Sequence, residues 1–269
     1  MSISPLAYIH KDAKIGENVT IEPFAVIQGE VSVGDGSHIM SHAVIMDGSN
    51  IGKNCVIYPG AVIGAIPQDL KFIGEKTTVE IGDGTTIREC ATVNRGTKDK
   101  WKTVVGQNCL IMGYAHIAHD CILGNNVILA NAVQLAGHVE IGNYAIMSGL
   151  SGAVQFTRIG AHTYVAGHTV VRKDVPPYVK AAREPMSFAG INTVGLQRSK
   201  FSPAKIQEIT DIYKILFIEK NTTTAALEKV EATFPPTPER DAILNFIKSS
   251  KTGIIKRPSK TESDEDKPF

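Results

Sequence analysis

Large apolar residues recur every six positions along most of the chain. The phase runs from Ile15 to Ile63, resumes at Ile81 and continues, after a second break, from Val105 to Val171. A small residue follows most of them four positions later, which accounts for three of the four cysteines as inward-facing residues. A six-residue period fits neither a helix of 3.6 residues per turn nor an alternating strand, but it fits short strands joined by corners. The pattern therefore predicts a parallel β-helix.

Glycine and asparagine stand where the corners of such a coil are expected. Segments such as IGEN, VGDG, IGKN and LGNN place them directly after a large apolar residue, and both residues suit the positive φ of a sharp turn. The pattern resembles the hexapeptide repeat of the left-handed β-helix acyltransferases. That resemblance implies a left-handed parallel β-helix in which three hexapeptides make one coil of about 18 residues.

Two segments break the six-residue spacing and gain charged residues. They cover about 64–80 and 98–104. We expect them to leave the coil as loops, because long excursions from a rigid scaffold often carry function. Prolines in the segment DVPPY then end the repeat. We therefore expect the β-helix, with its two loop excursions, to occupy residues 1–190.

The repeat gives way to helical patterns near the C-terminus. Ser202 and Pro203 form an N-cap and first-turn signal. Apolar spacing predicts three helices, over about 206–216, 225–230 and 242–247. The expected fold is thus mainly β, with a small α-helical C-terminal domain over 191–255. The segment 256–269 is charged and contains proline, so we expect a disordered tail there.

The charge balance excludes a broadly basic or acidic protein. The 269 residues include 28 Lys and Arg against 27 Asp and Glu, a formal net charge of +1, which gives no sign of nucleic-acid or membrane-surface binding. The N-terminus lacks a signal-peptide pattern, and no apolar run reaches the roughly 18 residues of a membrane span. We expect a cytoplasmic protein. The four cysteines show no CxxC spacing, which argues against a structural zinc site or a disulfide framework.

Three histidines fall in one stretch of the repeat whose other residues serve packing. Stacking residues 18 apart on adjacent coils gathers six positions in one small area: His116, His119, Asp120, Gly137, His138 and Gln155. A histidine beside a carboxylate suits general-base chemistry on a hydroxyl, because the carboxylate orients the ring and stabilises its charged form. Gly137, one coil from His119, offers an unobstructed backbone N–H for a developing oxyanion.

Six segments extend the resemblance over nearly the whole chain. They are PQDLK (67–71), NRGT (94–97), AHIAHDC (115–121), LAGHV (135–139), DVPPY (174–178) and INTVGLQRSKFS (191–202). Together they resemble the signatures of the acyl carrier protein:UDP-N-acetylglucosamine O-acyltransferase family. The resemblance implies transfer of a 3-hydroxyacyl group from acyl carrier protein to the 3-hydroxyl of UDP-N-acetylglucosamine, the first step of lipid A biosynthesis.

The resemblance also implies roles for individual residues in a direct, general-base-assisted attack on the thioester. His119 removes the proton from the sugar hydroxyl, Asp120 is its partner, and the Gly137 N–H stabilises the oxyanion. Eight positions are implied to contact the sugar nucleotide, the last two near the uridine and the diphosphate: Gln68, Asp69, Lys71, His116, His138, Gln155, Asn192 and Arg198. Gly167 matches the position that limits acyl length, and a glycine there favours a long donor.

The resemblance also implies a homotrimer with active sites between subunits, and an enzyme without a metal or another cofactor.

The chain departs from the family pattern at Asn94 and Val154, where some relatives carry His, and at Ser199, where some carry Arg. The first exchange loses a titratable group, and the last weakens a contact to phosphate or carrier protein. The sequence leaves open the acyl length, the docking surface for the carrier, and whether the acceptor is UDP-N-acetylglucosamine or its 3-amino analogue.

Three other protein classes share features of this sequence. The γ-type carbonic anhydrases hold zinc on three histidines, and His116, His119 and His138 superficially suit metal ligation. The helical domain and the PQDLK loop argue against that class. A noncatalytic β-helix scaffold predicts regular exposed ladders rather than a local cluster of His and Asp. The related N-acyltransferase typically carries an additional N-terminal uridine-binding domain, whereas the coil here begins at about residue 11.

Overall fold

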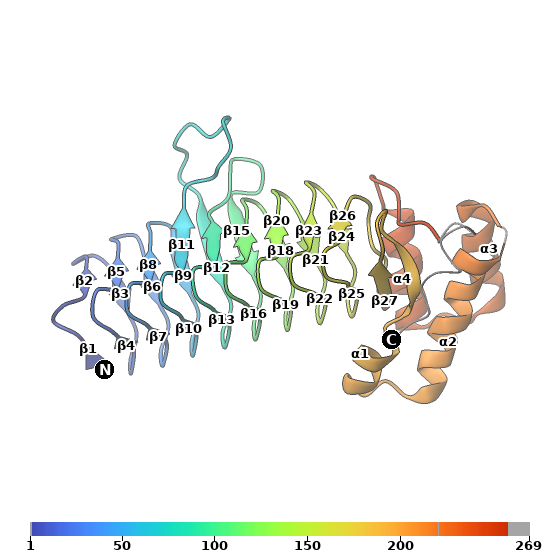
Figure 1. The fold of residues 1–269 in the computed structure, drawn as a ribbon, viewed down its shortest axis with the longest axis horizontal. Helices are drawn as coiled ribbons and strands as arrows, with labels where there is room; N and C mark the ends of the chain where they lie inside the picture. Colours follow the sequence, from blue (N-terminus) through green and yellow to red (C-terminus); the bar gives the residue numbers. More distant parts are fainter. Residues whose placement is uncertain (1, 220, 258–269) are drawn as a thin grey trace.

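The computed structural model describes residues 2–219 and 221–257, which form a long parallel β-helix followed by a group of helices (Figure 1). Most strands are two residues long, and each pairs in parallel with a strand of the next coil. His116 pairs with Gln134, and Gln134 with Gly152. The 18-residue stacking that the repeat predicts is therefore confirmed in the part of the coil that carries the histidines.

Three sheets form the walls of the β-helix. The first contains β1 (Ser2–Ile3), β4 (Thr20–Ile21), β7 (His38–Ile39), β10 (Val56–Ile57), β13 (Thr86–Ile87), β16 (Leu110–Ile111), β19 (Ile128–Leu129), β22 (Ile146–Met147), β25 (Tyr164–Val165), β27 (Val179–Ala182) and β28 (Ser187–Ile191). The second contains β2 (Tyr8–Ile9), β5 (Val26–Ile27), β8 (Val44–Ile45), β11 (Val62–Ala65), β14 (Thr92–Asn94), β17 (His116–Ile117), β20 (Gln134–Leu135), β23 (Gly152–Ala153) and β26 (Val170–Val171). The third contains β3 (Lys14–Ile15), β6 (Ser32–Val33), β9 (Ser49–Ile51), β12 (Thr78–Ile81), β15 (Lys102–Val105), β18 (Ile122–Leu123), β21 (Glu140–Ile141) and β24 (Arg158–Ile159).

The six-residue period fills the interior of the coil. Its large apolar residues point inward, and Ile45, Ile63 and Ile117 are completely buried. Burying a side chain of this size contributes roughly 1.5–3 kcal/mol, so the repeated inward residue stabilises every coil. The small residues of the repeat are buried with them, including the three cysteines that the period places inside. The first strands lie earlier than the expected start of the coil near residue 11, because Ser2 already pairs with Thr20.

Two loops leave the coil on the same side (Figure 1). The first loop, residues 66–77, connects β11 to β12, and the second loop, residues 95–101, connects β14 to β15. The first loop is shorter than the segment that loses the six-residue spacing, because β11 and β12 extend into that segment. The second loop begins and ends three residues earlier than expected, because β15 begins at Lys102. The added residues lengthen the coils without breaking the sheets, since Val56 pairs with Thr86, and Thr86 with Leu110.

The C-terminal helices are α1 (Thr193–Arg198), α2 (Pro203–Tyr213), the π-helical turn η1 (Lys214–Ile218), α3 (Thr223–Thr233) and α4 (Pro238–Lys248). The Ser202 hydroxyl caps α2, as the sequence predicts. Helix α1 was not expected, because it is only six residues long and buries Leu196 alone. No helix among residues 2–219 and 221–257 is long and apolar enough to cross a membrane.

The helices are fixed to the last coil. The Tyr213 hydroxyl donates to the carbonyl of Pro177 at 2.7 Å, and the chain after α4 returns to the β-helix, where Lys256 bridges to Ser187. The expectation of disorder from residue 256 is therefore wrong for Lys256. The rest of the predicted tail, residues 258–269, lies outside the described residues.

Candidate active site

His119 and Asp120 form a buried pair in the turn between β17 and β18. Nδ1 of His119 lies 2.9 Å from Oδ2 of Asp120, and the two side chains are 7% and 0% exposed. Burial opposes ionisation of Asp120, but hydrogen bonds from Thr97 and His119 outweigh it and hold the pKa of the carboxyl below its usual value. An ionised carboxylate can only accept, so Nδ1 carries the proton. Nε2 of the neutral ring is then free to accept one from a substrate.

Gly137 lies one coil away, against the ring of His119. The backbone N–H of His138 donates to the carbonyl of His119 at 3.0 Å, which fixes the register of the two turns. A Cβ on Gly137 would lie 2.5 Å from Cε1 of His119. The backbone N–H of Gly137 donates no hydrogen bond among the described residues. The backbone N–H of Gln155, one coil further along, donates none either, so an unpaired N–H does not by itself single out Gly137. What distinguishes Gly137 is the closeness of its backbone to the base.

A pocket of about 570 Å³ lies on the second sheet beside this pair. Its polar end is lined by five side chains: Gln68, His116, His119, Gln134 and Gln155. The rest of its lining consists of small or apolar residues: Ala118, Leu135, Ala136, Gly137, Gly152, Ala153, Val154 and Val170. An apolar trough that ends at a histidine can hold a hydrocarbon chain and present its head group to that histidine.

His116 forms a second polar contact at this end of the pocket. Its Nδ1 lies 2.7 Å from the Thr92 hydroxyl. Burial, followed by the neighbouring His119, lowers the pKa of His116. His116 is therefore neutral near pH 7 and serves as a hydrogen-bonding group rather than a charge.

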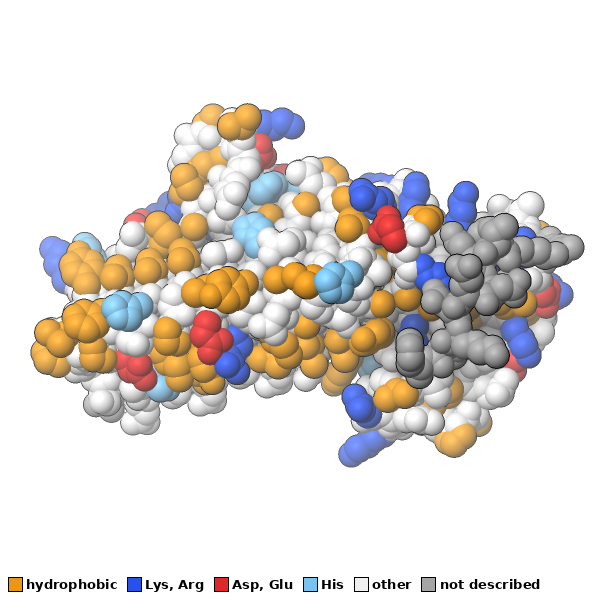
Figure 2. Space-filling view, in the orientation of Figure 1, with side chains coloured by type: hydrophobic (Ala, Val, Ile, Leu, Met, Phe, Trp, Pro, Cys, Tyr) orange, Lys and Arg blue, Asp and Glu red, His pale blue; other side chains and the backbone are white. Residues whose placement is uncertain are grey.

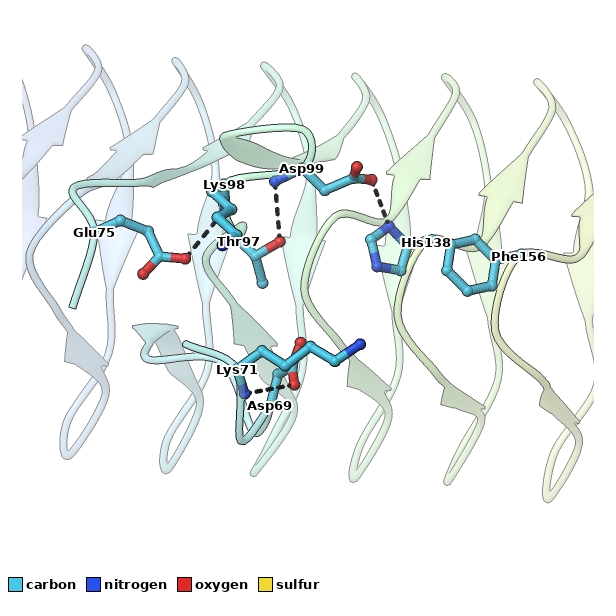
Figure 3. Close-up of a pocket in the computed structure, with 8 residues that line it drawn as sticks. All are labelled: Asp69, Lys71, Glu75, Thr97, Lys98, Asp99, His138 and Phe156. Carbon is cyan, nitrogen blue, oxygen red and sulfur yellow. Dashed lines mark hydrogen bonds and ion pairs between the residues drawn. The ribbon is translucent and has the colours of Figure 1, made fainter. Parts of the chain in front are cut away.

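A smaller pocket, of about 230 Å³, is lined by residues of both loops together with His138 and Phe156 of the coil (Figure 3). It is lined by Asp69, Lys71, Glu75, Thr97, Lys98, Asp99, His138 and Phe156. The ring of His138 stacks on Phe156 with centroids 4.4 Å apart, and its Nδ1 lies 3.1 Å from Oδ2 of Asp99. Burial lowers the pKa of His138, and Asp120 partly offsets this. The mixture of basic, acidic and aromatic groups suits a polar ligand rather than a hydrocarbon chain.

Apart from Asp120, which contacts the base, three predicted residues line neither pocket. Asn192 caps α1 and donates from its side-chain amide to the carbonyl of His162 at 2.8 Å. Arg198 is exposed at the end of α1, and this helix lies on the opposite side of the molecule from the loops (Figure 1). Gly167 lies in the turn between β25 and β26, where a Cβ would lie 3.0 Å from the carbonyl of Gly149. One chain therefore gathers the predicted base and six predicted contacts, but not these three residues.

Some residues of the site were not found from the sequence. Thr97 and Asp99 reach it from the second loop, and the spacing of a coil gives no position for a loop. Phe156 could have been found, because it stands 18 residues after His138 and so continues its column.

The departures from the family pattern have local roles. Asn94 is buried and donates to the carbonyls of Ala65 and Ile66, at the base of the first loop. Val154 adds apolar surface to the larger pocket, and Ser199 is the C-cap of α1.

His119, Asp120 and His138 lie close enough to be considered as metal ligands, with donor atoms within 4.8 Å of one another. His116, which the zinc alternative needs, is not in this group. Both oxygens of Asp120 already accept hydrogen bonds, from Thr97, from the Lys100 N–H and from His119. A metal ion would have to displace at least one of these hydrogen bonds.

A β-helix of hexapeptides with an oriented histidine at the polar end of an apolar trough defines a hexapeptide-repeat transferase. Residues 30–65 and 102–137 match the family described as bacterial transferase hexapeptide (six repeats), and residues 174–255 match UDP-N-acetylglucosamine O-acyltransferase, domain 2. This chain belongs to the acyl-[acyl-carrier-protein]:UDP-N-acetylglucosamine O-acyltransferase family, as the sequence motifs predicted.

Close relatives match over nearly their whole length. The enzymes of that name from Thiobacillus denitrificans and Thermodesulfovibrio yellowstonii are 39% and 42% identical, over 95% and 94% of this chain and 99% of each relative. The crystal structure of UDP-N-acetylglucosamine acyltransferase from Bacteroides fragilis is 49% identical and superposes with a TM-score of 0.93, covering 94% of this chain and 99% of that one. The Francisella novicida enzyme is 37% identical with a TM-score of 0.92, over 99% and 100% of the two chains. The predicted fold class, a left-handed parallel β-helix followed by helices, is confirmed.

Proposed function

We propose that this protein transfers a 3-hydroxyacyl group from acyl carrier protein to the 3-hydroxyl of UDP-N-acetylglucosamine, in the first step of lipid A biosynthesis. The names of its relatives support the two substrates. The observation that carries the chemistry is the buried His119–Asp120 pair at the polar end of the apolar pocket. In this proposal a long acyl chain lies in that pocket, with its thioester beside the histidine.

His119 acts as general base in this proposal. Its Nε2 takes the proton of the sugar hydroxyl while the oxygen attacks the thioester carbon. Asp120 stabilises the imidazolium that forms, and the Gly137 N–H donates to the oxyanion of the tetrahedral intermediate. The carbon–sulfur bond then breaks, and the imidazolium returns its proton to the leaving thiolate of the carrier. A positioned general base contributes roughly 10²–10⁴-fold to such a reaction.

The two pockets divide the substrates between them. We propose that Gln68, His116 and Gln155 contact the sugar near the base, since they line the polar end of the larger pocket. Asp69, Lys71 and His138 contact the rest of the nucleotide from the smaller one. The domain boundaries remain predictions. We propose that residues 1–190 carry the catalytic groups and that the segment 191–255 contributes Asn192 and Arg198.

We further propose a homotrimer in which each site uses two subunits. Asn192 and Arg198 lie away from His119 in one chain, so a shared nucleotide needs a neighbouring copy. The surface is consistent with assembly. Hydrophobic side chains lie along the β-helix (Figure 2), and the exposed large hydrophobic residues of the coil include Phe24, Tyr114 and Leu150, each more than half exposed. We expect the trimer to act in the cytoplasm, without a metal or another cofactor.

The test is acyl transfer by the purified protein from 3-hydroxyacyl carrier proteins of graded length. UDP-N-acetylglucosamine and its 3-amino analogue serve as parallel acceptors, and His119→Ala is the matched variant. We expect product on the oxygen acceptor, and its rate falls roughly 10²–10⁴-fold in His119→Ala. The variant should keep the circular dichroism spectrum of the wild type.

Each other outcome points to a different activity. Product on the amino acceptor alone replaces the O-acyltransferase with an N-acyltransferase. A carbonic anhydrase would instead form no product with either acceptor. The purified protein would then contain zinc and hydrate carbon dioxide in a reaction that a chelator inhibits.

A further inference from the structure

The second loop closes over the carboxylate of Asp120. Thr97 donates twice, from its N–H to Oδ1 at 3.0 Å and from its hydroxyl to Oδ2 at 2.6 Å. The N–H of Lys100 donates to Oδ1 at 3.2 Å. Together with His119, these donors engage both oxygens of a side chain that is fully buried. The orientation of Asp120 is therefore set by the loop as well as by its own turn.

The Thr97 hydroxyl is the one side-chain donor that the loop gives to Asp120. Its proton goes to Oδ2, the same oxygen that accepts from Nδ1 of His119. Its oxygen accepts the N–H of Asp99 at 3.3 Å, which fixes the hydroxyl within the loop. The loop can close this tightly because residue 96 is a glycine, and a Cβ there would clash with the backbone nitrogen of Lys102.

The charged and titratable groups near Asp120 do not supply the hydrogen bond that the Thr97 hydroxyl donates. Nε2 of His138 lies 3.8 Å from Oδ2, and the other ring nitrogen of His138 faces Asp99. The ammonium of Lys100 pairs instead with Glu140 at 2.8 Å. Among the described residues no Lys or Arg forms an ion pair with Asp120, so neutral donors keep it ionised. A lysine there would compete with His119 for the negative charge, whereas a hydroxyl does not.

We propose that Thr97 is a positioning residue for the general base: acting through Asp120, its hydroxyl holds the His119 ring with Nε2 turned toward the substrate. The inference rests on the proposed role of His119 and extends the catalytic machinery to the second loop. Thr97 also lines the smaller pocket, but its hydroxyl proton goes to Asp120 and not to a ligand. We therefore expect loss of the hydroxyl to lower the rate of the chemical step and to leave substrate binding nearly unchanged.

Three variants separate positioning from folding. Thr97→Val removes the hydroxyl at nearly constant volume, and Thr97→Ser keeps it. Thr85→Val is the matched control, because Thr85 is also buried, donates one hydrogen bond to the carbonyl of Gly106 and accepts one from the N–H of Cys109. Thr85 lies before β13 and lines neither pocket.

Kinetics provide the first readout. When a metal-binding histidine loses the hydrogen-bond partner that orients its ring, metal affinity or activity typically falls roughly 10- to 100-fold. We expect kcat of Thr97→Val to fall by a similar factor, and its KM to stay within about twofold of the wild-type value. Thr97→Ser should recover most of kcat, and Thr85→Val should keep it. The acidic limb of the kcat profile should move to higher pH in Thr97→Val alone, because Asp120 loses one of the hydrogen bonds that hold its pKa down.

The second readout does not need activity. In protein labelled with ¹⁵N-histidine, the His119 Nδ1–H should give an exchange-protected resonance, assigned by its absence from His119→Gln. Thr97→Val should shift or lose this resonance, and Thr97→Ser and Thr85→Val should keep it. The idea is overturned if Thr97→Val keeps both kcat and the resonance, or if Thr97→Ser is as impaired as Thr97→Val. If the wild type transfers no acyl group, the proposed function fails, and the resonance alone decides whether Thr97 positions His119.

Discussion

The imidazole of His119 lies against the α-carbon of Gly137, on the next coil. A Cβ at residue 137 would lie 2.5 Å from Cε1 and 2.7 Å from Nε2 of that ring, and real Cβ atoms are not found so close. The contact gives the glycine a packing role that holds whether or not its N–H binds an oxyanion. It also means that the position of the base and the path of the neighbouring turn cannot change independently.

Gly137→Ala should therefore impair catalysis by moving His119. The added methyl group displaces the ring, and a shift of about 1 Å in a catalytic group can cost 10²-fold. We expect a loss of kcat of about that size and a destabilisation of about 1–3 kcal/mol from overpacking. Steady-state kinetics and urea unfolding measure the two effects.

Gly113→Ala is the control for this substitution. A Cβ on Gly113 would come no closer than 3.3 Å, to the flexible amide of Asn131, so both activity and stability should remain near those of the wild type. A Gly137→Ala variant with wild-type kcat would show that the ring of His119 is free to move without cost.

The sequence predicted the coil and the two loop excursions, but not how the loops fold. The spacing that puts Ile117 inside the coil also put His119, Gly137 and Gln155 in one column, because identical coils stack at a fixed register. Thr97 could not be placed in this way, since a loop that leaves the coil follows no repeat. Its contact with Asp120 depends on how residues 95–101 fold back, which is decided by packing between segments far apart in the sequence.

The assembly predicts complementation between two inactive variants. His119→Ala removes the base, and Arg198→Ala removes the proposed contact to the diphosphate. If each site takes the two residues from different subunits, mixed trimers contain one intact site whenever both variants are present. Co-expression at equal levels should then restore about a quarter of the wild-type activity, the value for random mixing in a cyclic trimer.

Two controls accompany this measurement. Each variant alone should be close to inactive, and light scattering should give a trimer for the purified protein. Mixed trimers with no activity above the sum of the two variants would place His119 and Arg198 in the same site of one subunit, against the proposed arrangement.

Residue 167 should control donor length. A Cβ on Gly167 would lie 3.0 Å from the carbonyl of Gly149, so a larger side chain has to project away from the coil, where the family resemblance places the end of the acyl chain. We expect Gly167→Met to favour donors several carbons shorter than the wild type does. The ratio of kcat/KM between short and long donors measures this without depending on how much protein is folded. An unchanged ratio would remove Gly167 from the acyl path and leave the Val154–Val170 side of the larger pocket as the limit.

The stability of the last coils should depend on pH through His162. Its ring stacks between Tyr144 and Tyr178, with centroids 4.7 and 5.8 Å away, and burial lowers the pKa of this histidine. The unfolded imidazole titrates near 6.5, so below that pH the unfolded state binds a proton that the folded state resists. The free energy of unfolding should therefore fall as the pH drops below about 6.5, with a slope of at most about 1.4 kcal/mol per pH unit for one group.

His162→Phe keeps an aromatic ring in the stack and removes the titration. Urea unfolding at constant protein concentration, between about pH 8 and about pH 5.5, should give a smaller slope for this variant than for the wild type. Some slope should remain, because burial also lowers the pKa of His116 and His138. Tyr144→Phe retains His162 and its stacking partner, so it should keep the wild-type slope. Equal slopes for His162→Phe and the wild type would mean that the stack accepts a proton without loss of stability, through cation–π contacts with the two tyrosine rings.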